Sequence, residues 1–238
     1  GWTDYNHHIV DLNTQTGKWV GMLGTDFGSG SDAEISIVLP KLINYWNSGG
    51  LITINWHIRN PWTGGNAFDL TSVNITNLLT PGTAANTAYL SALDSRAVWL
   101  TQLRDAGVPV IWRPFHEMNN NDFWWSKGAG VSQADYIKLW QNMFNYYNNT
   151  KGLNNLLWLY SPNVQWSSNI TSVQTVDYYY PGAAYVDLVG EDVYAYGGSF
   201  LPNNNGSYDK LIALGKPMGL SEVGPWTTQQ DGSWDNMT

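Results

Sequence analysis

The chain contains four glutamates, and three of them lie in or directly after apolar, strand-like segments. Glu117 ends the run 107–117, Glu191 lies within 186–194, and Glu222 lies within 216–225. Glutamate is ordinarily a solvent-facing residue, so this placement is unusual for a purely structural role. The C-terminal ends of parallel strands meet at one edge of a sheet, which would bring these carboxylates together. A pair of carboxylates in such a place is the minimum machinery for cleaving a glycosidic bond.

Glu117 and Glu222 are the pair that we assign as catalytic. In this chemistry one carboxyl group stays protonated and donates to the leaving oxygen. The other stays ionised and either attacks the anomeric carbon or activates a water molecule. Glu191 is a reserve candidate, and its neighbour Asp192 could support either role.

Carboxylates in these positions could also have a structural or a metal-binding role. In the structural role, they would simply pair with Arg113 or Lys216. A metal site could involve His116-Glu117, but the zinc motif H-E-x-x-H is incomplete because position 120 is Asn. We therefore expect no metal.

The sequence also argues against nucleotide, nucleic-acid and membrane partners. The stretch 28–33 fits G-x-G-x-x-A, but the following strand-like segment, 54–57, lacks the acidic residue that a dinucleotide site needs. The G-x-S-x-G motif that carries the serine nucleophile of Ser-His-Asp hydrolases is also absent from the sequence, which argues against that kind of catalysis. A net charge of −8 disfavours phosphate backbones and anionic membranes, and no apolar run is long enough to span a bilayer. We expect no cofactor, no nucleic acid, no membrane and a monomer.

Six strand-like segments alternate with helical patterns, which is typical of a parallel sheet. Polar residues gathered at the ends of apolar strands favour an α/β fold of the (β/α)8 TIM-barrel type over an open sheet. Because a barrel needs eight strands, we expect it to be missing or truncated at its first and last strands, within a single domain covering residues 1–238. The six segments are 18–26, 51–57, 107–117, 156–163, 186–194 and 216–225.

The segments between the strands include three helices and one long loop. We expect Asp32 to cap a helix that ends near Ser48, and a second helix to cover 87–106. A third follows Ser132. The loop 60–87 is too long for a simple connection, so we expect it to form a wall of the cleft. With 14 Trp and 14 Tyr, the chain also has flat rings that could stack on sugars.

The run 110–119 (VIWRPFHEMN), followed by Phe123-Trp124-Trp125, resembles the acid/base segment of glycoside hydrolase family 26, whose members are chiefly endo-β-1,4-mannanases. The similarity extends in order over residues 18–226. Four further segments resemble strands of the same family: 52–57 with Asn60-Pro61, 157–163, 189–194 and 220–224.

This resemblance implies a retaining, double-displacement mechanism, in which the two carboxyl groups lie about 5–5.5 Å apart. Glu117 would be the general acid and then the base, Glu222 would be the nucleophile, and Tyr194 would hydrogen-bond the nucleophile. The implied substrates are mannan, glucomannan or galactomannan, and the implied location is secreted. The residues expected at the substrate-binding site are His57, His116, Tyr194, Trp124, Trp125 and Arg113.

The chain departs from the family pattern at three places. Asp122 stands where the family usually has a Trp, and Phe123 is the candidate replacement. Glu191 stands where the family often has an uncharged residue. The sequence also stops before the last strand and its usual Trp. Two alternatives stay open: the same mechanism on another β-glycan, such as β-1,3-xylan or a mixed-linkage glucan, or a non-catalytic glycan-binding barrel.

Overall fold

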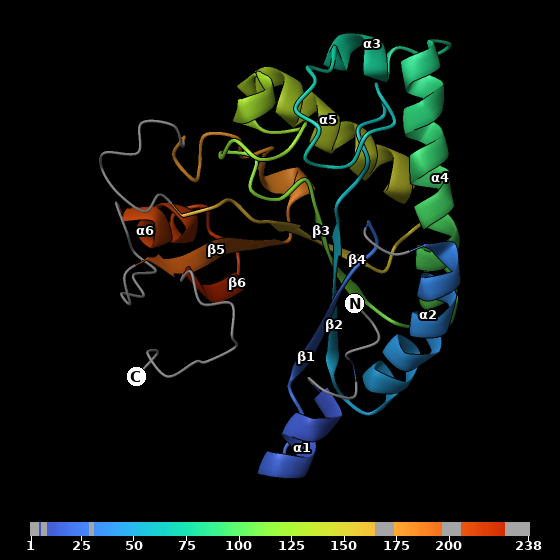
Figure 1. The fold of residues 1–238 in the computed structure, drawn as a ribbon, viewed down its shortest axis with the longest axis vertical. Coiled ribbons are helices and arrows are strands. Elements are labelled where there is room, and N and C mark those ends of the chain that lie inside the picture. The colour runs from blue at the N-terminus through green and yellow to red at the C-terminus, as the bar shows by residue number, and fades with distance from the viewer. Residues whose placement is uncertain (1–4, 6–8, 29–30, 165–173, 197–205, 227–238) are drawn as a thin grey trace.

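The fold is built on one curved sheet of six parallel strands (Figure 1). The structure is a computed structural model, and it describes residues 5, 9–28, 31–164, 174–196 and 206–226. Each strand pairs in parallel with the next one along the chain, so the order in space follows the order in sequence. The strands are β1 (Met22–Asp26), β2 (Leu51–Trp56), β3 (Val110–Pro114), β4 (Leu156–Tyr160), β5 (Leu188–Tyr196) and β6 (Met218–Trp226).

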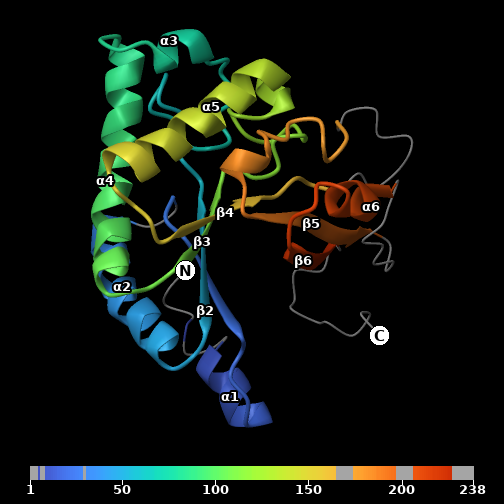
Figure 2. The ribbon, with the colours of Figure 1, turned by 180° about the vertical axis from the view of Figure 1, so that it is seen from behind.

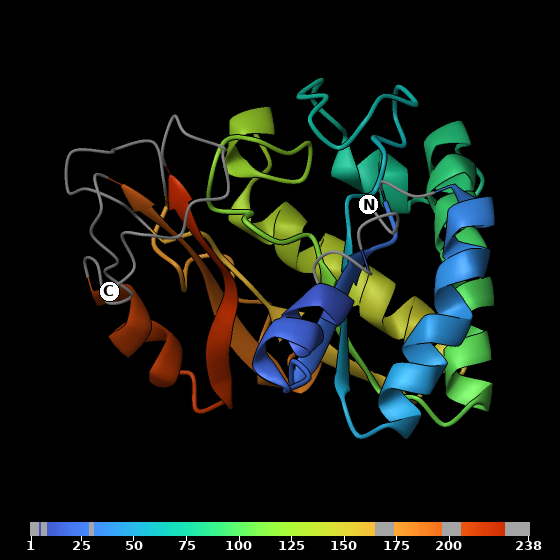
Figure 3. The same cartoon turned by 60° about the horizontal axis from the view of Figure 1, so that its bottom comes forward.

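This arrangement confirms the α/β class and the incomplete barrel expected from the sequence. The described strands β1 and β6 are the two edges of the sheet, so it forms an open arc. A closed barrel of this type has eight strands, two more than the described residues supply. Figures 2 and 3 show the arc from behind and from below, with the larger helices on its outer side.

The helices follow the strands as the alternating pattern predicts. Helices α2 and α4 lie side by side along one flank of the sheet, α3 and α5 lie near its upper end in Figure 1, and α6 packs beside β5. Shorter turns of 3-10 or π type occupy 127–129, 146–150 and 183–185. The α-helices are α1 (Asp11–Thr16), α2 (Asp32–Asn47), α3 (Ile75–Leu79), α4 (Ala84–Asp105), α5 (Gln133–Asn145) and α6 (Ser207–Ile212).

The start of helix α2 differs from the sequence expectation. Its N-cap is Ser31 and not Asp32, because the Ser31 hydroxyl accepts from the Glu34 backbone N–H and the Glu34 carboxylate accepts in return from the Ser31 backbone. Asp32 is instead the first helical residue and pairs with Arg96 of α4 at 2.7 Å. The helix that we expected from residue 87 begins earlier, because Thr83 caps it.

A layer of large aromatic side chains fills the space between the sheet and the helices. The rings of Trp112 and Trp158, on neighbouring strands, both contact Tyr147, with centroids 6.0 and 6.3 Å from its ring. Trp140 of α5 meets Trp158 edge to face at 5.9 Å. Buried rings of this size contribute much of the apolar area removed from water on folding. Many of the aromatic residues are therefore core residues and do not line a cleft.

The loop after β2 is fixed against the C-terminal end of the sheet. Its residues Val73, Ile75 and Leu78 are buried, the last two in α3. The Ala67 carbonyl accepts from the Trp124 backbone N–H at 3.1 Å, which joins this loop to the loop after β3. Phe68 is 59% exposed, so the loop also presents an aromatic ring to solvent. Among the described helices, none is both long enough and apolar enough to cross a membrane.

Candidate active site

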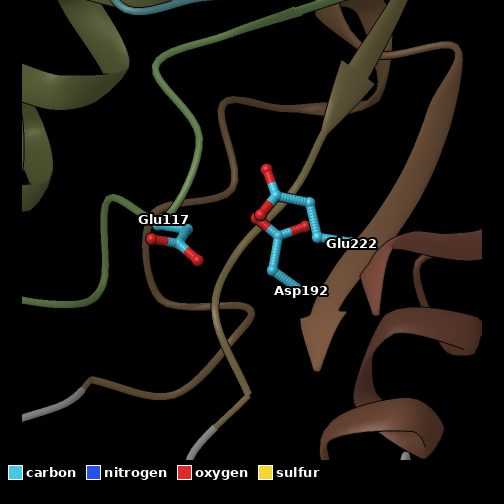
Figure 4. Close-up of side chains that lie close together, drawn as sticks. All are labelled: Glu117, Asp192 and Glu222. Carbon is cyan, nitrogen blue, oxygen red and sulfur yellow. The ribbon is translucent and has the colours of Figure 1, made fainter. Parts of the chain in front are cut away.

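Three carboxylates meet at the C-terminal end of the sheet (Figure 4). Glu117 follows β3, Asp192 lies in β5 and Glu222 lies in β6. One oxygen from each lies within 4.8 Å of the other two. The two glutamates that we paired from the sequence are therefore neighbours, although they come from strands that do not touch each other in the sheet.

The backbone after β3 turns sharply to deliver Glu117. Phe115 and Glu117 have φ values of +48° and +53°, a left-handed conformation that costs free energy for residues other than glycine. The Glu117 N–H donates to the Ser161 carbonyl at 2.8 Å. Tyr136 donates from its hydroxyl to the Phe115 carbonyl at 2.9 Å, and Trp125 donates from Nε1 to the His116 carbonyl at 2.8 Å. These bonds hold the strained turn in place.

The carboxyl group of Glu117 is buried and is bonded by amides. Asn163 donates from Nδ2 to Oε1 at 2.8 Å, and Asn120 donates from Nδ2 to Oε2 at the longer distance of 3.4 Å. Burial, together with the negative charges of Asp192 and Glu222, raises the pKa of Glu117 to about 8, although Asn163 and the Arg113 cation oppose the rise. The raised pKa favours the protonated form of Glu117 near neutral pH, which is the form that a general acid needs.

Glu222 has a different environment, because two strong donors occupy its two oxygens. Arg113 donates from Nη2 to Oε1, and the Tyr194 hydroxyl donates to Oε2. Burial first, and then the Glu222 charge, raise the pKa of Tyr194, so its phenol keeps the proton that it donates. A guanidinium has no acceptor, so its contact fits the carboxylate form of Glu222. Figure 4 shows Glu222 beside Asp192 and facing Glu117.

Arg113 is the cation that this cluster shares. It is 1% exposed, and it donates to Asp192 from Nη1 at 2.7 Å and to Asn55 from Nε at 2.8 Å, in addition to its bond with Glu222. Burial alone would lower the pKa of Arg113, but the charges of Asp192 and Glu222 outweigh this effect and raise it. The structural role considered for the carboxylates is thus true in part, since Arg113 pairs with two of them. It makes no comparable bond to Glu117, which amides hold instead.

Lys216, the other cation considered for that role, donates to the Ala183 carbonyl at 2.8 Å. The three clustered carboxylates are also the described residues whose spacing would suit a metal ion. A cation placed among them would face the charge of Arg113, which already pairs with both Asp192 and Glu222. Arginine therefore supplies the positive charge in this cluster.

A pair of histidines lies beside the carboxylates. The Nε2 atoms of His57 and His116 are 3.2 Å apart, and Nδ1 of His57 bonds to Asp26 at the end of β1. Burial, followed by the charges of Arg113 and His57, lowers the pKa of His116 well below its usual value. Asp26 was not among the residues singled out from the sequence, and its partnership with His57 was missed. The signal was its place next to β2 in a sheet that follows chain order.

The two tryptophans expected at the substrate-binding site are core residues in this structure. Trp124 and Trp125 are fully buried, and Trp124 donates from Nε1 to the Ile58 carbonyl at 2.9 Å. Phe123 stacks on Trp125 with ring centroids 4.5 Å apart and also approaches His57 and His116. The tryptophans thus support Phe123 and the turn that carries His116.

Glu191, the reserve candidate, is on the wrong face of β5. Adjacent residues of a strand point to opposite faces, so Glu191 points away from the site when Asp192 points into it. It is fully buried beside the Ser207 hydroxyl of α6. Burial raises its pKa to about 7, against the effect of Ser207. Glu191 is therefore a buried carboxyl group outside the cluster of three.

Comparison with known proteins identifies the family. The profile of glycosyl hydrolase family 26 matches residues 11–237. The chain belongs to this family. Two mannan endo-1,4-beta-mannosidases are similar to it: one from Caldalkalibacillus mannanilyticus, 37% identical over 92% of this chain and 44% of the relative, and one from Bacillus subtilis, 32% identical over 94% and 64%. The chain thus spans about half to two thirds of the length of these curated relatives.

Solved structures of family 26 agree with the fold. A Bacillus subtilis mannanase superimposes with a TM-score of 0.79 at 31% identity, over 92% of this chain and 67% of that chain. A β-mannanase from a symbiotic protist of the termite Reticulitermes speratus, solved in complex with a gluco-manno-oligosaccharide, gives 0.78 at 25% identity, over 99% and 79%. The strand arc described above is thus the family 26 arrangement, and the identification predicted from 110–125 is confirmed.

Proposed function

We propose that this chain is the catalytic domain of a retaining endo-glycoside hydrolase that cleaves β-1,4-mannosidic bonds in mannan, glucomannan or galactomannan. The observation that carries the proposal is the approach of the Glu117 and Glu222 carboxylates to within 4.8 Å. Retaining enzymes place their two carboxyl groups about 5–5.5 Å apart, whereas inverting enzymes leave about 6.5–9.5 Å for a water molecule. The mannanase names of the relatives support the choice of substrate.

The first step uses the two carboxyl groups in their different protonation states. Glu117 donates its proton to the glycosidic oxygen while the Glu222 carboxylate attacks the anomeric carbon. The bond between that carbon and the leaving oxygen breaks, and an ester to Glu222 forms. Arg113 and Tyr194 hold the two Glu222 oxygens, so the nucleophile is oriented before the sugar arrives.

The second step follows from the change in charge. Esterified Glu222 no longer carries the negative charge that contributes to the raised pKa of Glu117. The pKa of Glu117 therefore falls, and the residue, now a carboxylate, takes a proton from water. That water attacks the anomeric carbon and releases Glu222 as a carboxylate. Two inversions give a product with the original anomeric configuration.

The remaining expectations are part of the same proposal. His57 and His116 bind hydroxyl groups of the sugar at the cleavage point, and Phe123 offers a ring beside them. Trp124 and Trp125 contribute indirectly, because they support Phe123 and the turn that carries His116. The enzyme uses no metal or other cofactor, acts as a monomer on a polysaccharide, and is secreted.

The test compares three Glu→Gln variants with the wild-type chain on mannan. Glu117→Gln and Glu222→Gln should each lower kcat by at least about three orders of magnitude, because each removes a group that acts in both steps. Glu191→Gln is the matched control, since it makes the same change outside the cluster, and it should keep its turnover. Turnover near the wild-type rate in either of the first two variants contradicts the proposal.

Substrate and stereochemistry need two further measurements. Reducing-sugar release should be greater from β-1,4-mannan than from β-1,3-xylan or barley mixed-linkage glucan. Proton NMR at early times should show the β-anomer of the new reducing end before mutarotation. Early appearance of the α-anomer would instead indicate inversion.

A further inference from the structure

One extra residue in β6 changes which side chains face the site. Glu191 of β5 pairs with Leu220 and Asp192 pairs with Glu222, so Ser221 is left without an opposite residue, as in a β-bulge. In a regular strand Ser221 would point away from the side that Glu222 faces. Here both side chains reach the same cluster: the Ser221 hydroxyl lies 2.6 Å from Asp192 Oδ1, while Glu222 bonds Arg113.

A glycine on the neighbouring strand makes this arrangement possible. A Cβ atom added to Gly190 would lie 2.8 Å from Oγ and 3.0 Å from Cβ of Ser221. Contacts that short would force Ser221 to shift, and the Gly219 carbonyl, 3.3 Å away, limits the space. The absence of a side chain at Gly190 therefore allows Ser221 to point towards Asp192.

Asp192 is fully buried and has both of its oxygens engaged. Oδ2 accepts from Arg113 at 2.7 Å, and Oδ1 accepts from the hydroxyls of Ser221 at 2.6 Å and Ser161 at 2.8 Å. The two hydroxyls are also 2.6 Å from each other, so two protons serve three short contacts. Donating both of them to Asp192 gives the carboxylate the greatest support.

The charge on Asp192 matters because Arg113 depends on it. Burial raises the pKa of Asp192 to about 6; Arg113, Ser221 and Ser161 oppose the rise, and the Glu222 charge adds to it. Among the described residues, Glu117, beyond β3, and Tyr194, on its own strand, also interact with its charge, as does its chain neighbour Glu191. If Asp192 took up a proton, Arg113 would lose the fully buried anion that fixes its Nη1, and the orientation in which Nη2 meets Glu222 would no longer be held from that side.

We propose that Ser221, turned inward by the bulge and by the space at Gly190, is a positioning residue that keeps Asp192 ionised and thereby holds Arg113 against Glu222. The inference rests on the proposed role of Glu222 as the nucleophile. Ser221 acts through Asp192 and Arg113 and does not touch the sugar.

The test replaces Ser221 and measures kcat/KM on mannan as a function of pH, following the acid limb of that profile. Ser221→Ala removes one donor to Asp192, so the acid limb should move to higher pH by about one unit, and kcat should fall about tenfold with KM nearly unchanged. Ser221→Thr keeps the hydroxyl and should restore the limb. Gly190→Ala removes no hydroxyl group but displaces Ser221, so it should move the acid limb in the same direction as Ser221→Ala.

Ser126→Ala is the matched control for the loss of a buried hydroxyl. Ser126 is fully buried and donates to the Phe123 carbonyl at 2.7 Å, away from Asp192. This variant should lower the melting temperature without moving the acid limb. An unmoved limb in Ser221→Ala, or an equal loss in the Ala and Thr variants, would overturn the inference.

A second measurement separates this inference from the proposed function. Carbon-13 NMR of the side-chain carboxyls reports the titration of Asp192 in the free protein, with no need for turnover. A higher midpoint in Ser221→Ala supports the positioning role even if wild-type protein releases no sugar from mannan, a result that would refute only the proposed function. An unchanged midpoint in an active enzyme refutes only the role of Ser221.

Discussion

Replacing Asn163 should move the alkaline limb of activity, because Asn163 makes the shorter of the two amide bonds to Glu117. Its Nδ2 lies 2.8 Å from Glu117 Oε1, and this bond favours the ionised carboxylate. Asn163→Ala removes the side-chain amide but leaves the backbone N–H of residue 163 free to donate to Asn119 Oδ1, as it does now at 2.9 Å. Without the amide, Glu117 should hold its proton to a higher pH.

The size of the shift follows from the difference between two hydrogen bonds. A bond to an ionised acceptor contributes about 1.5–3 kcal/mol, and a bond to a neutral one about 0.5–1.5 kcal/mol. The difference is about 1 kcal/mol, which corresponds to slightly less than one pKa unit at about 1.36 kcal/mol per unit. The pKa of Glu117, about 8 in the wild-type chain, should therefore rise by up to about one unit in Asn163→Ala.

The assay is the pH dependence of kcat/KM on mannan, which reports the ionisations of the free enzyme. Asn120→Ala is the matched control, because its amide lies 3.4 Å from the other oxygen of Glu117 and should contribute less. We expect a clear upward shift of the alkaline limb in Asn163→Ala and a smaller one in Asn120→Ala. An unmoved limb in Asn163→Ala, a downward shift, or a larger effect in Asn120→Ala would refute this reasoning about Glu117.

Three further predictions concern residues around the site. Burial raises the pKa of Glu191 to about 7 in the folded chain, from 4.5 for an exposed carboxyl group, so the stability of the wild-type fold decreases as pH rises from about 4.5 to 7. Glu191→Gln should therefore be more stable than wild type at pH 8, by at most about 3 kcal/mol, and equally stable near pH 4. Urea unfolding at the two pH values measures the difference. A Cβ at Gly224 would lie 2.9 Å from the Tyr194 ring, so Gly224→Ala should displace the ring from Glu222 and lower kcat about tenfold with little change in KM; an unaffected kcat would contradict this. Asp26→Ala frees the His57 ring and should raise KM about tenfold, more than it lowers kcat; calorimetric binding of a mannooligosaccharide provides the check.

The pairing of Glu117 with Glu222 could be predicted from the sequence because it depends on a general property of parallel sheets. Strands that alternate with helices all end at one edge, so carboxylates at their C-terminal ends must meet there. Glu191 could not be separated from Asp192 in the same way. The choice between them depends on which alternate residues of β5 face the site, and a shift of one residue turns every side chain to the opposite face.

Other features of the site depend on contacts between distant segments. The bonds from Arg113 to Asp192 and Glu222 join three strands, and the sequence left open whether this arginine binds substrate or pairs with the carboxylates. The bulge at Ser221 has no pattern of its own in LSEVG, because a bulge is a property of the pairing between two strands. Capping at Ser31 was within reach of sequence reasoning, since Glu34 stands at the third helical position.

The chain-order pairing of the strands has a consequence for the order in which the site is assembled. Because every strand pairs with the one before it, the sheet can extend from β1 to β6 as the chain leaves the ribosome. Glu117 obtains its carbonyl and amide partners once β4 is in place, but Glu222, the proposed nucleophile, is carried by β6, the last described strand. Most of the secondary structure can therefore form before the proposed catalytic pair is assembled. Recovery of turnover during refolding would time the docking of the final strand, whereas circular dichroism would follow the earlier growth of the sheet.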